Sequence, residues 1–120
     1  MYTFSFEKLN VWQESIELVK SIYTETRKFP DEEKFGLVSQ LRRASVSISS
    51  NLAEGTSRNT NNDKARFTTI AYSSLMEVLN QLIISKELEM LHEEVYNELR
   101  PQVEKIANML NALKKSQLNN

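Results

Sequence analysis

The stretch Gln40-Leu-Arg-Arg-Ala-Ser-Val-Ser-Ile-Ser-Ser-Asn-Leu-Ala-Glu-Gly-Thr-Ser-Arg58 decides the fold. Apolar residues recur through it and just before it at intervals of three or four, at Leu37, Leu41, Ala44, Ile48 and Leu52. This spacing predicts a helix with one apolar stripe facing a core. Serines occupy much of its remaining surface, and because they favour helices weakly, we expect neighbouring helices to pack closely and hold it. We expect Gly55 to follow the last turn in a left-handed conformation.

Three further amphipathic helices are available to pack against this one. Their apolar or small residues keep helical spacing in the series Leu9, Trp12, Ile16, Val19, Tyr23, Thr26; Phe67, Ala71, Ser74, Val78, Leu82, Ser85, Leu88; and Val95, Leu99, Val103, Ile106, Leu110, Leu113. Together with the breaks at Pro30 and in the polar run 56–62, they predict helices at about residues 7–28, 34–54, 63–90 and 93–116.

Short connections between four such helices predict an all-α fold, an up-down-up-down antiparallel four-helix bundle, as one domain over residues 1–120. Asn62 is the expected cap of the third helix. Pro101 falls inside the fourth helix, where we expect a kink and not a break, because the apolar spacing continues across it. Residues 116–120 are expected to fray.

Length and composition exclude several classes of protein. A chain of 120 residues can bury one small core and leaves little room for an enzyme cleft. The absence of cysteine excludes disulfides, thiolate nucleophiles and thiolate metal sites. Neither a signal sequence nor an apolar run of about twenty residues is present, so we expect a cytoplasmic protein without membrane contact.

Charge is unevenly distributed along the chain. The net charge of −1 argues against a generic nucleic-acid-binding protein, but from Arg42 to Arg66 basic residues outnumber acidic ones five to two. From Phe67 to Arg100 acidic residues outnumber basic ones six to two. The basic group is either an ordinary solvated surface paired with acids or a patch that contacts phosphates. Its members are Arg42, Arg43, Arg58, Lys64 and Arg66.

The chain resembles the four-helix-bundle family named after the 23S rRNA intervening-sequence protein. The residues that carry the resemblance are Phe6, Leu9, Val11, Trp12, Phe29, Pro30, Phe35, Gly36, Leu37, Gln40, Leu41, Arg42, Arg43, Ala44, Ser47, Ile48, Asn51, Leu52, Ala53, Glu54, Gly55, Arg58, Arg66 and Phe67. Members are similar to ring-shaped oligomers proposed to handle nucleic acid, and one related branch is the partner of a reverse transcriptase. The resemblance therefore implies a homopentamer and raises the expectation of nucleic-acid binding.

Other candidate sites are weaker. Glu89 and His92 form a Glu-x-x-His motif of the kind that binds metals in helical bundles, but a single histidine favours a surface or capping role. We therefore expect no metal, no cofactor and no catalytic residue. Asn51 and Glu54 lie on or beside the apolar stripe. They are expected either to form a buried hydrogen-bonded pair with backbone or with Tyr72 or Gln81, or to line a subunit interface or a channel in an oligomer.

Two hypotheses about function follow. The first is a non-enzymatic ring that binds RNA or another nucleic acid; the second is a scaffold for another protein that uses the acidic third and fourth helices. Self-association has a motive independent of the resemblance, because several apolar residues lie off the predicted stripes. These residues are Phe4, Phe6, Val11, Val46, Ile70, Ile83 and Ile84.

Overall fold

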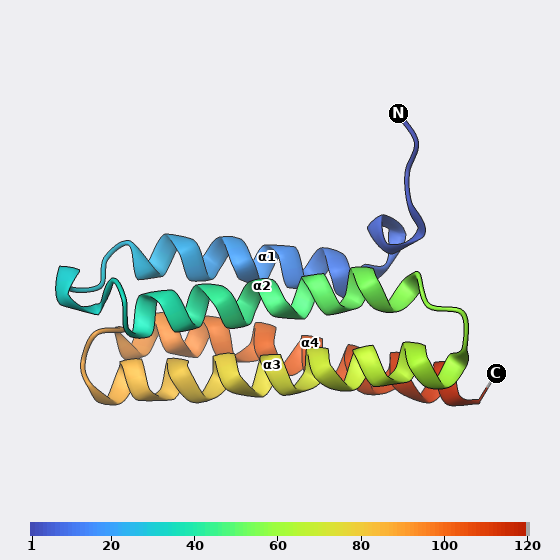
Figure 1. The fold of residues 1–120 in the computed structure, drawn as a ribbon. Coiled ribbons are helices and arrows are strands. Elements are labelled where there is room, and N and C mark those ends of the chain that lie inside the picture. Colours follow the sequence, from blue (N-terminus) through green and yellow to red (C-terminus); the bar gives the residue numbers. More distant parts are fainter. Residues whose placement is uncertain (120) are drawn as a thin grey trace.

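The computed structural model describes residues 1–119 and has four α-helices and no strand in that range. The helices are α1 (Asn10–Thr26), α2 (Leu37–Thr56), α3 (Asn61–Glu87) and α4 (Glu93–Leu118). Short 3₁₀ segments, η1 (Ser5–Lys8) and η2 (Asp31–Glu33), precede α1 and α2. Consecutive helices run in opposite directions in Figure 1. The predicted all-helical class is confirmed.

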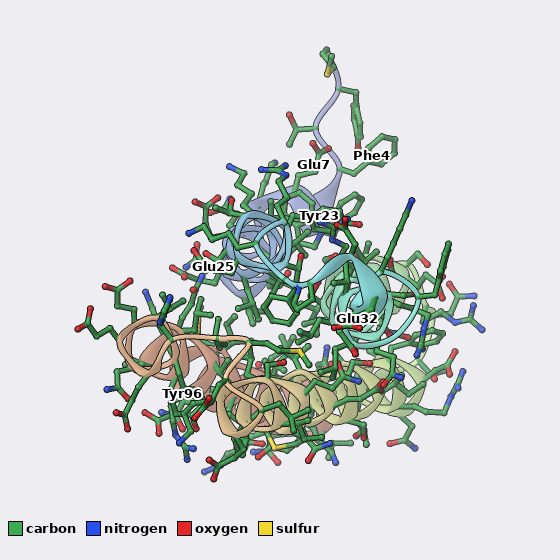
Figure 2. The ribbon with its side chains drawn as sticks, turned by 90° about the vertical axis from the view of Figure 1, so that its left-hand side faces the viewer. Phe4, Glu7, Tyr23, Glu25, Glu32 and Tyr96 are labelled. Atoms are coloured by element: carbon green, nitrogen blue, oxygen red, sulfur yellow. The ribbon has the colours of Figure 1, made fainter. Side chains whose placement is uncertain are left out.

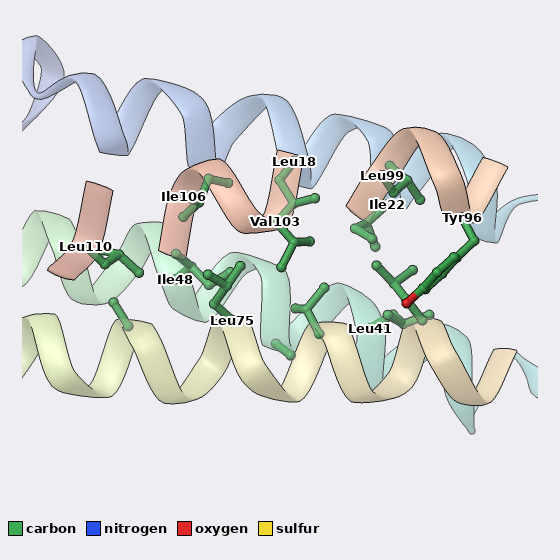
Figure 3. Packing of buried hydrophobic residues seen from close by; sticks show 14 of the residues in the cluster. Leu18, Ile22, Leu41, Ile48, Leu75, Tyr96, Leu99, Val103, Ile106 and Leu110 are labelled. Atoms are coloured by element: carbon green, nitrogen blue, oxygen red, sulfur yellow. The ribbon is translucent and has the colours of Figure 1, made fainter. Parts of the chain in front are cut away.

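All four helices contribute to one apolar core. Figure 3 shows α4 residues such as Val103 and Ile106 beside Leu18 of α1, Ile48 of α2 and Leu75 of α3. The stripe predicted on α2 is confirmed, since every member except the half-buried Leu37 is buried. Within residues 1–119 no helix is both long and apolar enough to cross a membrane.

Buried serines allow the helices to approach closely at little polar cost. Ser15, Ser45 and Ser85 are fully buried, and each hydroxyl donates to a carbonyl three or four residues earlier in its own helix. The Ser47 and Ser74 hydroxyls lie 2.8 Å apart and join α2 to α3. Because these hydroxyls are hydrogen-bonded, serine can fill core positions without leaving unpaired polar atoms.

The predicted stripe on α1 is wrong by one position. The residues of α1 that are buried are Val11, Ser15, Leu18, Ile22 and Thr26, so only Thr26 belongs to both series. Ile16, Val19 and Tyr23 are half-buried and lie outside the core cluster. A one-residue shift turns a helix by about 100°. The helix therefore has a second apolar stripe, made by these three residues, beside the one that faces the core.

The helix ends differ from the predicted ones by two or three residues, except at the start of α4. Gly55 stands inside α2 and has no positive φ, so its predicted role after the last turn is wrong. The absence of a side chain there serves packing, since a Cβ would lie 2.9 Å from Cβ of Phe67. Thr60, and not Asn62, caps α3, since its side chain accepts a hydrogen bond from the Asp63 N–H. Helix α4 continues through Pro101, so the expected absence of a break is confirmed, whereas the kink stays a prediction. The expected fraying is wrong for residues 116–118, which are helical, and Asn120 lies outside the described residues.

Candidate nucleic-acid interface

Two arginines meet at the connection between α2 and α3. Arg58 Nε donates to Asp63 Oδ2 at 2.6 Å, and Arg66 Nε donates to Asp63 Oδ1 at 3.0 Å. Both guanidinium groups also lie against the ring of Phe67, at 5.2 and 4.6 Å from its centroid. We call Arg58, Asp63, Arg66 and Phe67 the arginine cluster.

Local structure fixes the arginine cluster. The Thr60 cap starts α3 and places Asp63 in its first turn, where a carboxylate also benefits from the helix dipole. Arg66 follows Asp63 by three residues and so shares its face of the helix. Phe67 is buried against Gly55 of α2, which holds the ring as a fixed base for both arginine side chains. The arginines themselves remain 46% and 57% exposed, and can therefore reach a ligand in solvent.

Arg58 and Arg66 change the protonation equilibrium of Asp63. Hydrogen bonds from Arg58 and then from Arg66 lower the pKa of the Asp63 carboxyl below its usual value of 3.8. The carboxylate is therefore ionised at neutral pH and cancels one of the two positive charges. The arginine cluster keeps a net positive charge with two exposed guanidinium forks, which suit bidentate contact with phosphate.

The five basic residues predicted as one patch are separated into two places. Arg43 lies about 20 Å from the end of α2, and Arg58 follows that end. Arg42 holds the end of α1: its Nε donates to Thr26 Oγ1 at 3.0 Å, and its guanidinium lies 4.4 Å from the ring centroid of Tyr23. Arg43 is exposed and lies 3.8 Å from a Glu77 carboxylate oxygen. Neither adds to the arginine cluster.

Lysines of α3 and α4 extend the arginine cluster instead. Lys64 follows Asp63 directly and is half-buried. The last turns of α4 lie beside the start of α3. Two contacts show this: Thr68 Oγ1 donates to Gln117 Oε1 at 2.8 Å, and Lys114 lines a hollow with Thr68. Lys114 and Lys115 were missed by reading the sequence for linear charge runs. An antiparallel arrangement of the last two helices was the signal that would have found them.

Charge is thus polarised along the bundle. The end formed by the α2–α3 connection and the last turns of α4 carries the arginine cluster and the three lysines (Figure 1). At the opposite end, Figure 2 shows Glu25 and Glu32 near the viewer. That end comprises the end of α1, η2, the end of α3 and the start of α4. Its acidic residues outnumber the basic residues Arg27, Lys28, Lys34 and Lys86, and they are Glu25, Asp31, Glu32, Glu33, Glu87, Glu89, Glu93 and Glu94. Such a field orients charged partners before contact.

Asn51 and Glu54 do not form the expected buried pair. Asn51 is half-buried, and its Nδ2 donates to the Ser47 carbonyl at 2.8 Å. Glu54 is exposed, because the neighbouring Gly55 occupies the side of α2 that packs against α3. The alternative role of these residues, at a subunit interface, remains a prediction.

His92 stands at the start of α4 as its N-cap residue, exposed, and its side chain makes no capping hydrogen bond. Among residues 1–119, no three acidic or histidine side chains are grouped closely enough to hold a metal ion. Glu89, the other residue of the motif, lies in the turn between α3 and α4 and has a φ of 62°. The two residues therefore do not share a helix face, as a Glu-x-x-His metal motif requires.

These features define a class of protein: an all-helical bundle with a cluster of exposed arginines at one end. The chain belongs to the 23S rRNA-intervening sequence protein family, whose model matches residues 7–112. It is also similar to a crystal structure of a protein with unknown function from the S23 ribosomal protein family of Bacteroides thetaiotaomicron. The TM-score is 0.81 at 23% sequence identity, over 88% of this chain and 95% of that one. No curated protein matches the chain.

Proposed function

We propose that this protein is a non-enzymatic, up-down-up-down antiparallel bundle that self-associates, as a homopentamer, and binds RNA or another nucleic acid through its basic end. The observation that carries the proposal is the arginine cluster. Two exposed guanidinium groups are oriented by Asp63 and Phe67, with Lys64 between them in sequence and two lysines of α4 at the same end. The name of the family, which refers to a 23S rRNA intervening sequence, supports RNA as the ligand.

The proposed mode of binding is contact with the phosphate backbone. Phe67, the aromatic residue of the cluster, is buried, so its ring is not offered to a base for stacking. Guanidinium and ammonium groups contact phosphates irrespective of sequence. Several copies of the basic end in one oligomer would add weak contacts into useful affinity. Binding is therefore expected to be largely independent of sequence and strongly dependent on salt.

A second candidate function is a scaffold for a protein partner, such as a reverse transcriptase. The observation that favours it is Leu88, which is exposed between Glu87 and Glu89 at the acidic end. An exposed apolar residue surrounded by acids suits a basic partner with an apolar anchor. In this alternative the basic end has no ligand.

A salt titration of RNA binding tests the proposal. The double variant Arg58→Glu, Arg66→Glu should bind a mixed-sequence RNA at least tenfold more weakly than wild type at about 0.1 M salt, because two phosphate contacts are lost. Its affinity should also fall less steeply as salt rises. Binding is measured by fluorescence anisotropy at several salt concentrations.

The matched control is the double variant Lys20→Glu, Lys28→Glu, which changes the net charge equally. Both lysines are exposed, and each pairs with a glutamate three residues earlier, Glu17 or Glu25. The control should retain most of the affinity, and circular dichroism should show that both double variants remain helical. Equal binding by both variants, or no binding by wild type at low salt, would leave the scaffold function as the better account.

A further inference from the structure

The residues before η1 form an aromatic arm that stands away from the bundle. Tyr2 and Phe4 are 76% and 58% exposed, and their rings contact each other at a centroid distance of 4.9 Å. Figures 1 and 2 show this segment projecting from the four helices, with Phe4 outside the bundle. Two large rings in contact mainly with each other leave much apolar surface in water, which indicates a surface that is covered in an assembly.

A hollow of complementary chemistry lies towards the other end of the bundle. Its apolar lining includes Tyr23, Phe35 and Val46, and Phe35 is 89% exposed. Cations border it: the Lys34 ammonium lies 5.5 Å from the Phe35 ring centroid, and Arg43 is exposed at its edge. Aromatic rings bind to such a site by apolar contact and by the attraction of cations to their faces.

The arm of one chain projects away from the hollow of the same chain. From Asn10 to Tyr23, helix α1 rises about 20 Å. The segment from Tyr2 to Ser5, fully extended, covers about 10 Å, and η1 holds its base near the start of α1. In the structure the rings of Tyr2 and Phe4 therefore lie outside the hollow of their own chain. The arm of a second copy can approach the hollow directly.

We infer that the aromatic arm of one copy docks in the hollow of the next, with Tyr2 and Phe4 packing against Phe35 and Val46 beside Arg43. The inference rests on the proposed self-association and names its contact. Because the arm and the hollow are different surfaces, the contact is heterologous, and repetition of one heterologous contact closes a ring when the rotation between copies permits.

Directed cross-linking tests this contact, since the natural chain has no cysteine. Thr3, between the two aromatic residues, and Ser39, which lines the hollow, are both exposed. Chains carrying Thr3→Cys and chains carrying Ser39→Cys are co-expressed and mildly oxidised, and the disulfide-linked heterodimer is quantified. The control replaces Ser39→Cys by Asn97→Cys, an equally exposed class of position on α4.

The expected result is a several-fold excess of the heterodimer with Ser39→Cys over the control, lost when Tyr2→Ser and Phe4→Ser are added to the arm. The same double change should lower the mass of the oligomer in light scattering, whereas Leu118→Ser, at another exposed apolar residue, should not. An oligomeric wild type without this excess overturns the arm contact alone and leaves the hollow to a different occupant. A monomeric wild type overturns self-association and the arm contact together, and RNA binding by the basic end is still measured separately.

Discussion

Asp63 is the residue that sets the charge of the arginine cluster. Its carboxylate accepts hydrogen bonds from both arginines and so competes with any phosphate for the same donors. A ligand phosphate must either displace it or use the remaining N–H groups of the two forks. Asp63 therefore orients the guanidinium groups and limits their affinity at the same time.

Asp63→Asn should increase RNA affinity about three- to tenfold at 0.1 M salt, because one more positive charge becomes available to phosphate. Fluorescence anisotropy at several salt concentrations measures the affinity and its salt slope, which should steepen by up to about one unit. The control is Asp31→Asn, which changes net charge equally in η2 at the acidic end. Weaker binding by Asp63→Asn would mean that orientation by the carboxylate matters more than its charge.

The pH dependence follows from the lowered pKa of Asp63. A carboxyl whose pKa is lower in the folded chain stabilises the fold above its unfolded pKa, and this contribution disappears as pH falls through the folded value. That value lies below 3.8, so the ion pairs of Asp63 are intact throughout the range from about pH 5 to 8. Titration of Asp63 should therefore leave RNA binding unchanged over this range.

At the scale of the helix, the stripes predicted on α2, α3 and α4 are mostly buried. The exceptions are the half-buried Leu37, Val95 and Leu113 and the exposed Leu88, which lies beyond the end of α3. Helix α1 has two stripes of similar spacing, and the larger side chains of Trp12, Ile16 and Tyr23 favoured the wrong one. The true stripe includes Ser15, whose polarity counts against burial in a sequence pattern. Its hydroxyl is satisfied by the Trp12 carbonyl at 2.7 Å, which a sequence pattern cannot show.

The candidate site was predicted only in part, because a sequence shows which residues are close along the chain and not which are close in space. Arg58, Lys64 and Arg66 are close in sequence and lie at one turn, so their proximity follows from the chain itself. Arg42 and Arg43 share a stretch of sequence with them but are a helix length away. Lys114 and Lys115 reach the same end only because α4 packs beside α3. Linear proximity predicts a site within one turn and fails once a helix separates its residues.

The packing of α2 on α3 gives a test at Gly55. Replacing glycine by alanine inside a helix normally stabilises it by about 1 kcal/mol. Here the new methyl group would lie 2.9 Å from Cβ of Phe67, which is close to the backbone and cannot rotate away. We expect Gly55→Ala to lower the free energy of unfolding by about 1–2 kcal/mol, because overpacking outweighs the gain in helix propensity.

Urea denaturation at a fixed protein concentration measures this change. Ser50→Ala, at an exposed position of the same helix, serves as the control and should raise stability by about 0.5 kcal/mol. A Gly55→Ala variant as stable as the control would show that α3 moves away from α2 at no cost.

At the scale of the whole molecule, the exposed apolar residues and the arginine cluster lie in different places. The second stripe of α1 and the exposed residues Val46 and Ile70 lie along the sides of the bundle, while the arginine cluster lies at one end. Self-association along the sides would leave the basic ends free for RNA. The two activities proposed for this protein are therefore compatible in one assembly.

This separation predicts opposite responses to salt. An oligomer held by apolar contacts should persist at high salt, where repulsion between like-charged ends is screened, whereas RNA held by phosphate contacts should dissociate. Light scattering at micromolar concentration should give a mass of about five times the 13.9 kDa chain, unchanged between 0.1 and 1 M salt. A mass that falls as salt rises would place ionic contacts between the acidic and basic ends at the interface. The arginine cluster would then be occupied by a neighbouring chain, and RNA could bind only by displacing it.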